Sequence, residues 1–272
     1  MIFAAAFKIY STVSGRRFIS DLSDAQTKGY LSKTPHFNSI FNYLELEALT
    51  PLLRELITRS SAPLKSIESD FAVDASGFGT SKTATWFNEK YGQHHVAQEW
   101  VKLHLMCGVK TNVVTSVEVS GRFEHDYKFL PQLVEETAKH FTVKEVSADK
   151  GYSGQDAHDA IDKIGATPYI AFKMNATGGI GGLFEKMYHY YCLNREVFLS
   201  HYHKRSNVET TFSMIKAKFG GSLRSKTTTA QVNEALCKVL CHNICCLIQS
   251  MFEFGIDPSF AQCSPSSTSL GE

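Results

Sequence analysis

The stretch DFAVDAS, residues 70–76, is a short apolar run with an acid near its end, and it predicts a buried strand. Two more predicted strands follow, QEWVKLHLMCG (98–108) and NVVTSVEV (112–119). Only residues 109–111 separate these two strands, a connection length typical of a hairpin. This part of the chain is therefore predicted to begin with three strands joined as a meander.

Helices and strands alternate after the meander. Asp126 is a predicted N-cap for a helix whose apolar residues recur every three or four positions. A fourth strand, VKEVSAD (143–149), is followed by a helix at 153–164 and a fifth strand at 167–173. This order predicts an α/β fold with a mixed sheet flanked by helices.

The flanking regions are predicted to be helical. A helix at about 36–60 is interpreted as broken at Thr50-Pro51. The Gly-rich residues 174–182 lead into a small insertion, which precedes a long helix at 203–218. A last helix is predicted at 229–253.

We divide the chain into three parts. Residues 1–68 form an N-terminal helical segment, residues 69–256 the sheet-containing domain, and residues 257–272 a polar tail that we expect to be disordered. The opening residues, MIFAAAFKIYS, carry no capping residue and are interpreted as an internal helix of a longer, truncated region.

Composition excludes several classes of protein. The 272 residues are 43% hydrophobic and 20% charged, which argues against a disordered chain or a collagen. Lys and Arg number 28 against 27 Asp and Glu, so the chain is not a uniformly basic nucleic-acid coat. Such a balance still allows a local basic patch.

The seven cysteines do not form a secreted disulfide framework, since their number is odd and four lie between residues 237 and 246. We expect a reducing cytosol. The apolar stretch 235–252 contains Lys238 and His242 and is interpreted as a buried helix, with no membrane partner.

Three acids are placed where chemistry is expected. Asp74 lies near the end of the first strand, Asp149 ends the fourth, and Glu209 lies inside the long helix. If the first and fourth strands are neighbours, their acids share one sheet edge, which the helix can reach. Clustered carboxylates need neutralising cations, and Mg²⁺ or Mn²⁺ suits oxygen ligands. Each acid alone is also compatible with a cap, a turn or a surface charge.

The helix around Glu209 has the most specific pattern. In HYHKRSNVETTFSMIKAKFGG (201–221), Tyr202, Arg205, Glu209 and Lys216 are spaced three, four and seven residues apart. This spacing predicts one shared helix face, with Glu209 on metal and the two cations on phosphate. The alternative is an exposed face with an Arg205–Glu209 ion pair.

The residues around this helix are strongly basic. Between 200 and 226 there is one acid, Glu209, against six basic residues, a local charge of +5. A phosphate backbone is the natural partner of such a segment, although a solvated basic face is the simpler alternative.

In these motifs the chain resembles bacterial insertion-sequence transposases, which carry an Asp-Asp-Glu triad on a ribonuclease H-like fold. VDASGF contains the first acid, ADKGY the second, and Y-x2-R-x3-E-x6-K the third. The resemblance covers about residues 70–255 and extends more loosely to the start. It agrees with the strand order predicted above.

The resemblance implies DNA cleavage at transposon ends and transfer of the freed 3′-hydroxyl to target DNA, with two Mg²⁺ (or Mn²⁺) ions. Asp74, Asp149 and Glu209 would be catalytic metal ligands. Tyr202, Arg205 and Lys216 would position phosphate or the DNA end, and the protein would work as a homo-oligomer on DNA. Relatives of this kind usually have more chain before this region, so the alternative is a truncated, non-catalytic DNA-binding or inhibitory copy.

Other residues have competing interpretations. Lys150, beside Asp149, either contacts phosphate or offsets the carboxylate. We interpret Cys237, Cys241 and Cys245 as core residues in preference to a metal site. Trp86 and Trp100 are interpreted as core residues in preference to base-stacking platforms. His94, His95 and His125 are interpreted as ordinary loop residues.

Overall fold

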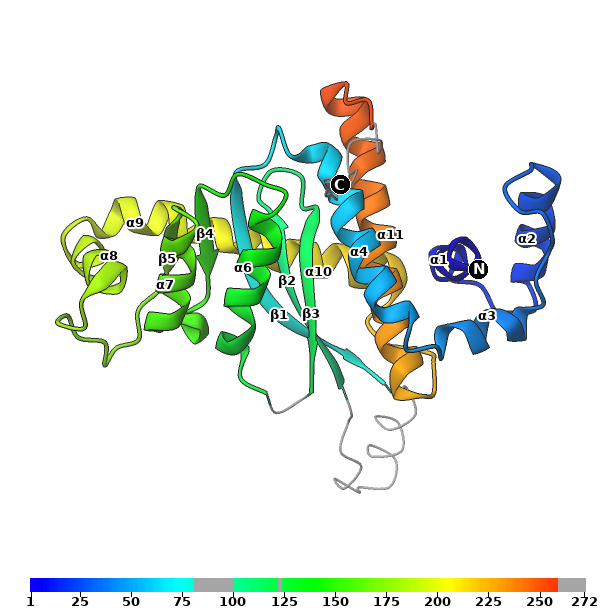
Figure 1. The fold of residues 1–272 in the computed structure, drawn as a ribbon, viewed down its shortest axis with the longest axis horizontal. Coiled ribbons are helices and arrows are strands. Elements are labelled where there is room, and N and C mark those ends of the chain that lie inside the picture. Colours follow the sequence, from blue (N-terminus) through cyan, green and yellow to red (C-terminus); the bar gives the residue numbers. More distant parts are fainter. Residues whose placement is uncertain (81–99, 122–123, 259–272) are drawn as a thin grey trace, which may run out of the picture.

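A five-stranded mixed sheet forms the centre of the molecule in the computed structural model, which describes residues 1–80, 100–121 and 124–258 (Figure 1). Its strand order is β3-β2-β1-β4-β5. The strands are β1 (Asp70–Gly79), β2 (Trp100–Gly108), β3 (Val114–Ser120), β4 (Glu145–Ala148) and β5 (Thr167–Ile170). The first three pair antiparallel, whereas β4 and β5 run parallel to β1. The predicted mixed sheet is thus confirmed, and it is consistent with a ribonuclease H-like α/β fold.

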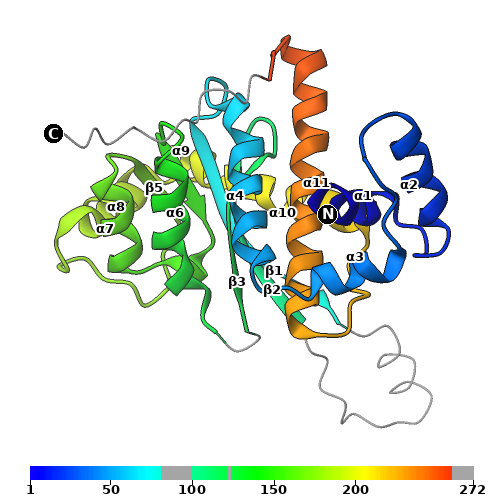
Figure 2. The ribbon, with the colours of Figure 1, turned by 45° about the vertical axis from the view of Figure 1, so that its right-hand side comes forward.

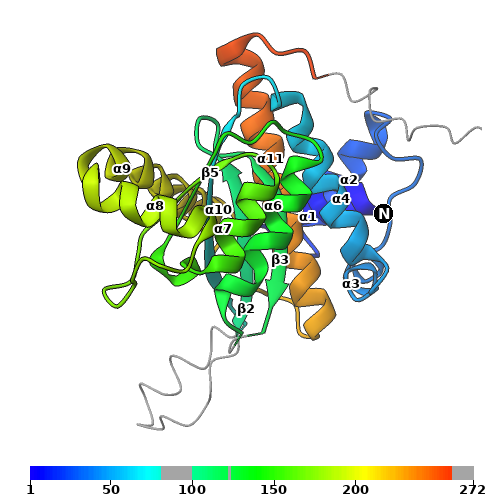
Figure 3. The same cartoon turned by 60° about the vertical axis from the view of Figure 1, so that its left-hand side comes forward.

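Two helices cover one face of the sheet, α6 (Leu130–Ala138) and α7 (Gln155–Lys163) (Figure 3). Alternate residues of β1, Phe71 and Val73, are buried there with Leu133 of α6 and Ile161 of α7. The period of two along an extended strand explains this alternation.

The opposite face packs against α10 (Ser206–Phe219) and α11 (Thr228–Phe254). Ala72 and Phe78 of β1 join one core cluster with Phe212 of α10 and Leu236 of α11. Asp74 falls between Ala72 and Phe78 in the alternation, so its side chain is on the face that α10 covers.

The N-terminal helices are α1 (Ile2–Ser11), α2 (Phe18–Thr27), α3 (Phe37–Leu44) and α4 (Leu49–Ser61), followed by the short 3₁₀ turn η1 (Ala62–Leu64). α1 and α3 pack on the side of α11 that faces away from the sheet (Figure 2). α4 contacts both α11 and β3. The predicted break at Thr50-Pro51 is wrong: the chain leaves helix after Leu44, and Pro51 lies in the first turn of α4, where its missing N–H costs nothing.

α11 is long and apolar enough to cross a membrane by length and composition, but 67% of its most apolar window is buried inside the protein. Asn233 and Asn243 on this helix donate hydrogen bonds to backbone carbonyls of Leu44, Ile57 and Val114. The buried-helix interpretation of 235–252 is therefore confirmed. Cys237 and Cys241 lie in the core cluster around this helix, as expected, whereas Cys245 is partly buried and packs against that cluster.

A small insertion precedes α10, as the sequence predicts. It consists of α8 (Gly182–Leu193) and α9 (Arg195–Tyr202), which build their own aromatic core around Phe172, Phe184 and Phe198. α9 packs against β4 and β5 and leads through the 3₁₀ turn η4 (His203–Arg205) into α10. The insertion thereby fixes the start of the helix that carries Glu209.

Candidate active site

Asp74 lies in the middle of the sheet, on β1. Its Oδ1 accepts a hydrogen bond from its neighbour's backbone, Ala75 N, at 2.8 Å. Burial raises the pKa of Asp74, and the charges of Asp149 and Glu209 raise it further, whereas Ala75 N–H and Arg205 lower it. The side chain thus combines partial burial with two acidic neighbours, an arrangement typical of functional sites.

Asp149 is brought to the same sheet edge by strand pairing. β1 and β4 are parallel neighbours with Val73 opposite Ala148. The residue after each of these two is an acid, Asp74 within β1 and Asp149 directly after β4. Asp149 also begins the 3₁₀ turn η3 (Lys150–Tyr152), where its Oδ1 accepts a hydrogen bond from Lys150 N at 2.7 Å. The arrangement that the sequence allowed, with the first and fourth strands as neighbours, is thus the one found.

Arg205 links Glu209 to Asp74. Its Nη1 donates a 2.6 Å hydrogen bond to Glu209 Oε1 and lies 4.0 Å from Asp74 Oδ2. The charge of Asp149 also acts on Arg205 and helps raise its pKa, against the effect of burial. Tyr202 lies beneath the guanidinium, with the ring centroid 5.7 Å from Arg205 Cζ. Arg205 therefore pairs with Glu209, approaches Asp74 and is influenced by the charge of Asp149.

Lys216 lies farther along α10. Its Nζ donates a 2.7 Å hydrogen bond to Ser76 Oγ on β1, and burial lowers its pKa. Between the strand and the helix is a pocket of about 560 Å³. Its lining consists of Asp74, Ala75, Ser76, Glu209, Phe212, Ser213, Lys216 and Ala217. The pocket gives a ligand access to the acids of both elements.

The expected uninterrupted helix over 203–218 differs from the structure. Tyr202 ends α9, Arg205 ends η4, and only Glu209 and Lys216 belong to α10. Tyr202, Arg205 and Glu209 nevertheless meet, because the three elements follow one another with helical backbone angles at the junctions. Lys216 does not join them and is bonded to Ser76 instead. Lys150 is exposed beside Asp149, outside the lining of the pocket.

The donor chemistry fits hard divalent cations. Asp74, Asp149 and Glu209 offer only oxygen, the ligand type that Mg²⁺ and Mn²⁺ prefer. Over the described ranges, no group of three or more His, Cys, Asp or Glu side chains is already close enough to hold an ion. Here Arg205 supplies the positive charge that the carboxylates require.

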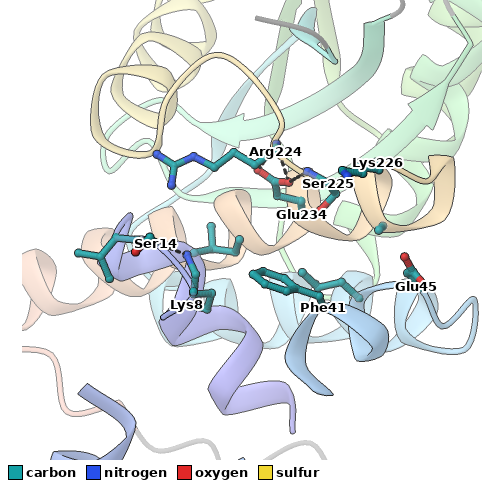
Figure 4. A pocket seen from close by; sticks show the side chains of 13 residues that line it. Lys8, Ser14, Phe41, Glu45, Arg224, Ser225, Lys226 and Glu234 are labelled. Carbon is teal, nitrogen blue, oxygen red and sulfur yellow. Dashed lines mark hydrogen bonds between the residues drawn. The ribbon is translucent and has the colours of Figure 1, made fainter. Parts of the chain in front are cut away.

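A second pocket, of about 450 Å³, lies between α1, α3, α11 and the loop before α11 (Figure 4). Arg224 and Lys226 lie on its loop side, and Glu234 holds the loop by accepting hydrogen bonds from the backbone N–H groups of Arg224 and Ser225. None of the three acids lines this pocket. Through Arg224 and Lys226, the basic segment around Glu209 thus reaches the N-terminal helices.

Two interpretations of single residues are wrong. Asp126 does not cap a helix: it lies inside the 3₁₀ turn η2 (Asp126–Phe129) and forms an ion pair with Lys102 of β2. Trp100 is not a core residue, because 41% of it is exposed at the start of β2. Trp86, His94 and His95 lie outside the described residues, as does most of the predicted tail.

No role was assigned to Tyr152 from the sequence. Its ring is 1% exposed, and its hydroxyl has no hydrogen-bond partner within the described part of the chain. The one available signal in the sequence is its place three residues after Asp149, at the end of the ADKGY motif.

Residues 65–244 match the family model described as a transposase DDE domain, which spans all three acids and the strands and helices that carry them. No solved structure matches the chain. Members of the matched family act on DNA by phosphoryl transfer and generally use divalent metal ions. With this match over well more than half of its length, the chain belongs to the transposase DDE-domain family and is an enzyme of DNA transposition.

Proposed function

We propose that this transposase serves an insertion sequence, cutting DNA at the ends of its element and joining the freed 3′-hydroxyl to target DNA. The observation that carries the proposal is the meeting of Asp74, Arg205 and Glu209 across β1 and α10. The Y-x2-R-x3-E-x6-K spacing supplies three of the side chains at this meeting point, Tyr202, Arg205 and Glu209.

We propose that Asp74, Asp149 and Glu209 are the metal ligands, for two Mg²⁺ or Mn²⁺ ions. A bound pair of such ions activates the attacking oxygen and stabilises the leaving oxygen of a phosphodiester. Burial is the main cause of the raised pKa of Asp74, and the charges of Asp149 and Glu209 add to it, so added positive charge at this site would stabilise the ionised carboxylate.

Four further side chains are proposed to hold the DNA. Arg205 is suited to a bidentate phosphate contact once its carboxylate partners bind metal, and Lys216 is suited to a point contact from the wall of the pocket. The exposed side chain of Lys150 reaches solvent next to Asp149. Tyr202 supports the Arg205 guanidinium with its ring face.

Oligomerisation and cellular location belong to the same proposal. Two element ends must be cut together, which favours a homo-oligomer assembled on DNA. The described cysteines are all free, which supports a reducing cytosol with the protein bound to the nucleoid. We further propose residues 1–68 as an N-terminal helical segment, residues 69–256 as the catalytic domain and 257–272 as its tail.

The test is a cleavage and strand-transfer assay with the flanking ends of the element, with and without Mg²⁺ or Mn²⁺. Wild-type protein should cut and join only with the cation, and Glu209→Gln should do neither. Glu253→Gln is the matched control, because Glu253 is an exposed glutamate on another helix, α11. Full activity of Glu209→Gln would contradict the assignment of the triad.

A further inference from the structure

Lys204 of η4 pairs with the first residues of two neighbouring strands. Its Nζ donates 2.7 Å hydrogen bonds to Asp70 Oδ2 on β1 and to Glu145 Oε2 on β4. Asp70 and Glu145 are Cα partners in the parallel pairing of these strands. Glu145 Oε2 also lies 2.9 Å from Nδ1 of His201, near the end of α9. These four residues form a strand-start cluster that joins the insertion to the sheet.

The strand-start cluster lies on the face of the sheet that carries the proposed metal ligands. Side chains alternate between the two faces along a strand, so Asp70 and Asp74 share one face of β1. Glu145 and Asp149 share the same face, because the backbone of Asp149 is still extended after β4. In both strands the cluster residue precedes the proposed ligand by four positions, or about 13 Å.

Lys204 is also tied to the start of α10. Its carbonyl oxygen accepts a 2.8 Å hydrogen bond from Asn207 Nδ2, in the first turn of that helix. The next residue, Arg205, donates the 2.6 Å hydrogen bond to Glu209 Oε1. One short segment is therefore held on β1 and β4 at Lys204 and carries the third acid five residues later.

The charges of the strand-start cluster depend on one another. The side chains of Lys204, Asp70 and Glu145 are 21–29% exposed, so water screens their ion pairs only in part. Burial alone would raise the pKa of Asp70, yet its contacts, chiefly those with Lys204, lower that pKa below its ordinary value. Without Lys204, two carboxylates on paired strands would repel each other.

We propose that Lys204 is a positioning residue of the active site: by pairing with the first residues of β1 and β4, it sets where Arg205 and Glu209 lie relative to the acids of those strands. This inference rests on the proposed metal ligands and DNA cleavage and deepens that proposal. The apolar packing of α10 on β1 is non-directional, whereas two charge-assisted hydrogen bonds impose a defined geometry. A misplacement of about 1 Å at a reacting centre can cost about 100-fold in rate.

The test compares full-length Lys204→Met and Lys204→Arg with the wild type. Single-turnover cleavage of element-end DNA is measured at saturating DNA and Mg²⁺, and Mn²⁺ affinity by titration with detection of free Mn²⁺ by electron paramagnetic resonance. Lys204→Met should cleave about 100-fold more slowly and bind Mn²⁺ about 10-fold more weakly, with unchanged DNA affinity. Lys204→Arg should restore both properties, because a guanidinium also bridges two carboxylates.

Lys163→Met is the matched control. Lys163 of α7 pairs with Glu135 of α6 at 3.2 Å, so this ion pair also joins two elements, but on the opposite face of the sheet. Its cleavage rate and Mn²⁺ affinity should match those of the wild type. Wild-type cleavage and Mn²⁺ binding by Lys204→Met would overturn the inference. A loss of DNA affinity with normal cleavage at saturating DNA would also overturn it, because Lys204 would then be a DNA contact.

The double variant Asp70→Asn/Glu145→Gln tests the same inference if Lys204→Met fails to fold. The amides keep the shapes of both side chains and remove the repulsion between the carboxylates, so the strands should still pair. Cleavage and Mn²⁺ binding should both weaken, because neutral acceptors hold the ammonium less firmly than carboxylates do. Wild-type values of both would overturn the inference.

Glu209→Gln separates this inference from the proposed function. If Glu209→Gln loses cleavage and Mn²⁺ binding while Lys204→Met keeps both, only the role of Lys204 fails. If Glu209→Gln keeps both, the proposed metal ligands fail, and the inference fails with them.

Discussion

Lys216 on α10 and Ser76 on β1, 140 residues apart in the chain, are joined by a 2.7 Å hydrogen bond from Nζ to Oγ. The bond ties the helix of Glu209 to the strand of Asp74, two residues beyond that acid. It also holds a partly buried ammonium at the wall of the pocket that the two acids share.

Lys216→Ala should weaken DNA binding and reduce its salt dependence. If the ammonium contacts one phosphate, the slope of log K against log salt concentration should become shallower by about one. Fluorescence anisotropy with element-end DNA at several salt concentrations measures this slope. Lys139→Ala is the control, since Lys139 is exposed and paired with Glu136 on α6. An unchanged slope for Lys216→Ala would exclude the phosphate contact.

Glu209→Gln should leave the fold intact and reduce metal-dependent cleavage at least about 100-fold, because an amide replaces a proposed ligand whose metal supplies several kcal/mol of transition-state stabilisation. The side chain is 53% exposed, so the substitution disturbs no core contact. Circular dichroism and single-turnover cleavage together separate a loss of chemistry from a loss of structure. The idea is contradicted if the variant cleaves at the wild-type rate.

His104 should make the protein sensitive to acid. The ring is fully buried, stacked on Phe129, and burial lowers its pKa to about 4, with a further lowering by Lys102 and an opposing effect of Asp126. Because the folded pKa lies below the ordinary value of 6.5, the neutral ring stabilises the fold above pH 6.5. This contribution is lost as the pH falls toward 4, and it amounts to roughly 3 kcal/mol.

Urea unfolding between pH 7 and pH 4 measures this effect. His104→Gln should lose less stability over that interval than the wild type does, because no imidazole has to be protonated in the core. His140→Gln is the control, since His140 is exposed and should leave the wild-type pH profile unchanged. Parallel pH profiles for wild type and His104→Gln would contradict the prediction.

Gly108→Ala should destabilise the hairpin that follows β2. A Cβ at this position would lie 2.3 Å from Glu68 Cδ. Glu68 cannot easily move away, because it accepts hydrogen bonds from Lys110 N, Thr111 N and Thr111 Oγ1. We expect a loss of about 1–3 kcal/mol in the free energy of unfolding.

Thermal or urea unfolding tests this loss against Gly154→Ala. A Cβ at Gly154 meets nothing within 4 Å, and its backbone is extended, so that variant should stay within about 0.5 kcal/mol of the wild type. Equal stabilities of the two variants would show that Glu68 yields more readily than its hydrogen bonds suggest.

The local sequence determined the elements and much of the site. The apolar run before Asp74, the acid after VKEVSA and the helical spacing around Glu209 each follow from nearest-neighbour patterning, which does not depend on distant contacts. The mixed character of the sheet followed from connection lengths, because a short hairpin forces antiparallel pairing and a helical crossover allows parallel pairing. The pairing of β1 with β4, and so the shared edge of Asp74 and Asp149, was compatible with these lengths but was decided by the tertiary structure.

Only the tertiary structure decided how polar side chains are partnered. Asp126 has the local appearance of a helix cap, yet its partner Lys102 comes from a strand more than twenty residues earlier. Trp100 has a large apolar side chain typical of a core, but its place at the start of β2 leaves it exposed. Hydrogen-bond and ion-pair partners depend on packing across the sheet, which no periodicity encodes. For the same reason, the burial of the Tyr152 hydroxyl could not be predicted, because it depends on the packing of η2, η3 and β1.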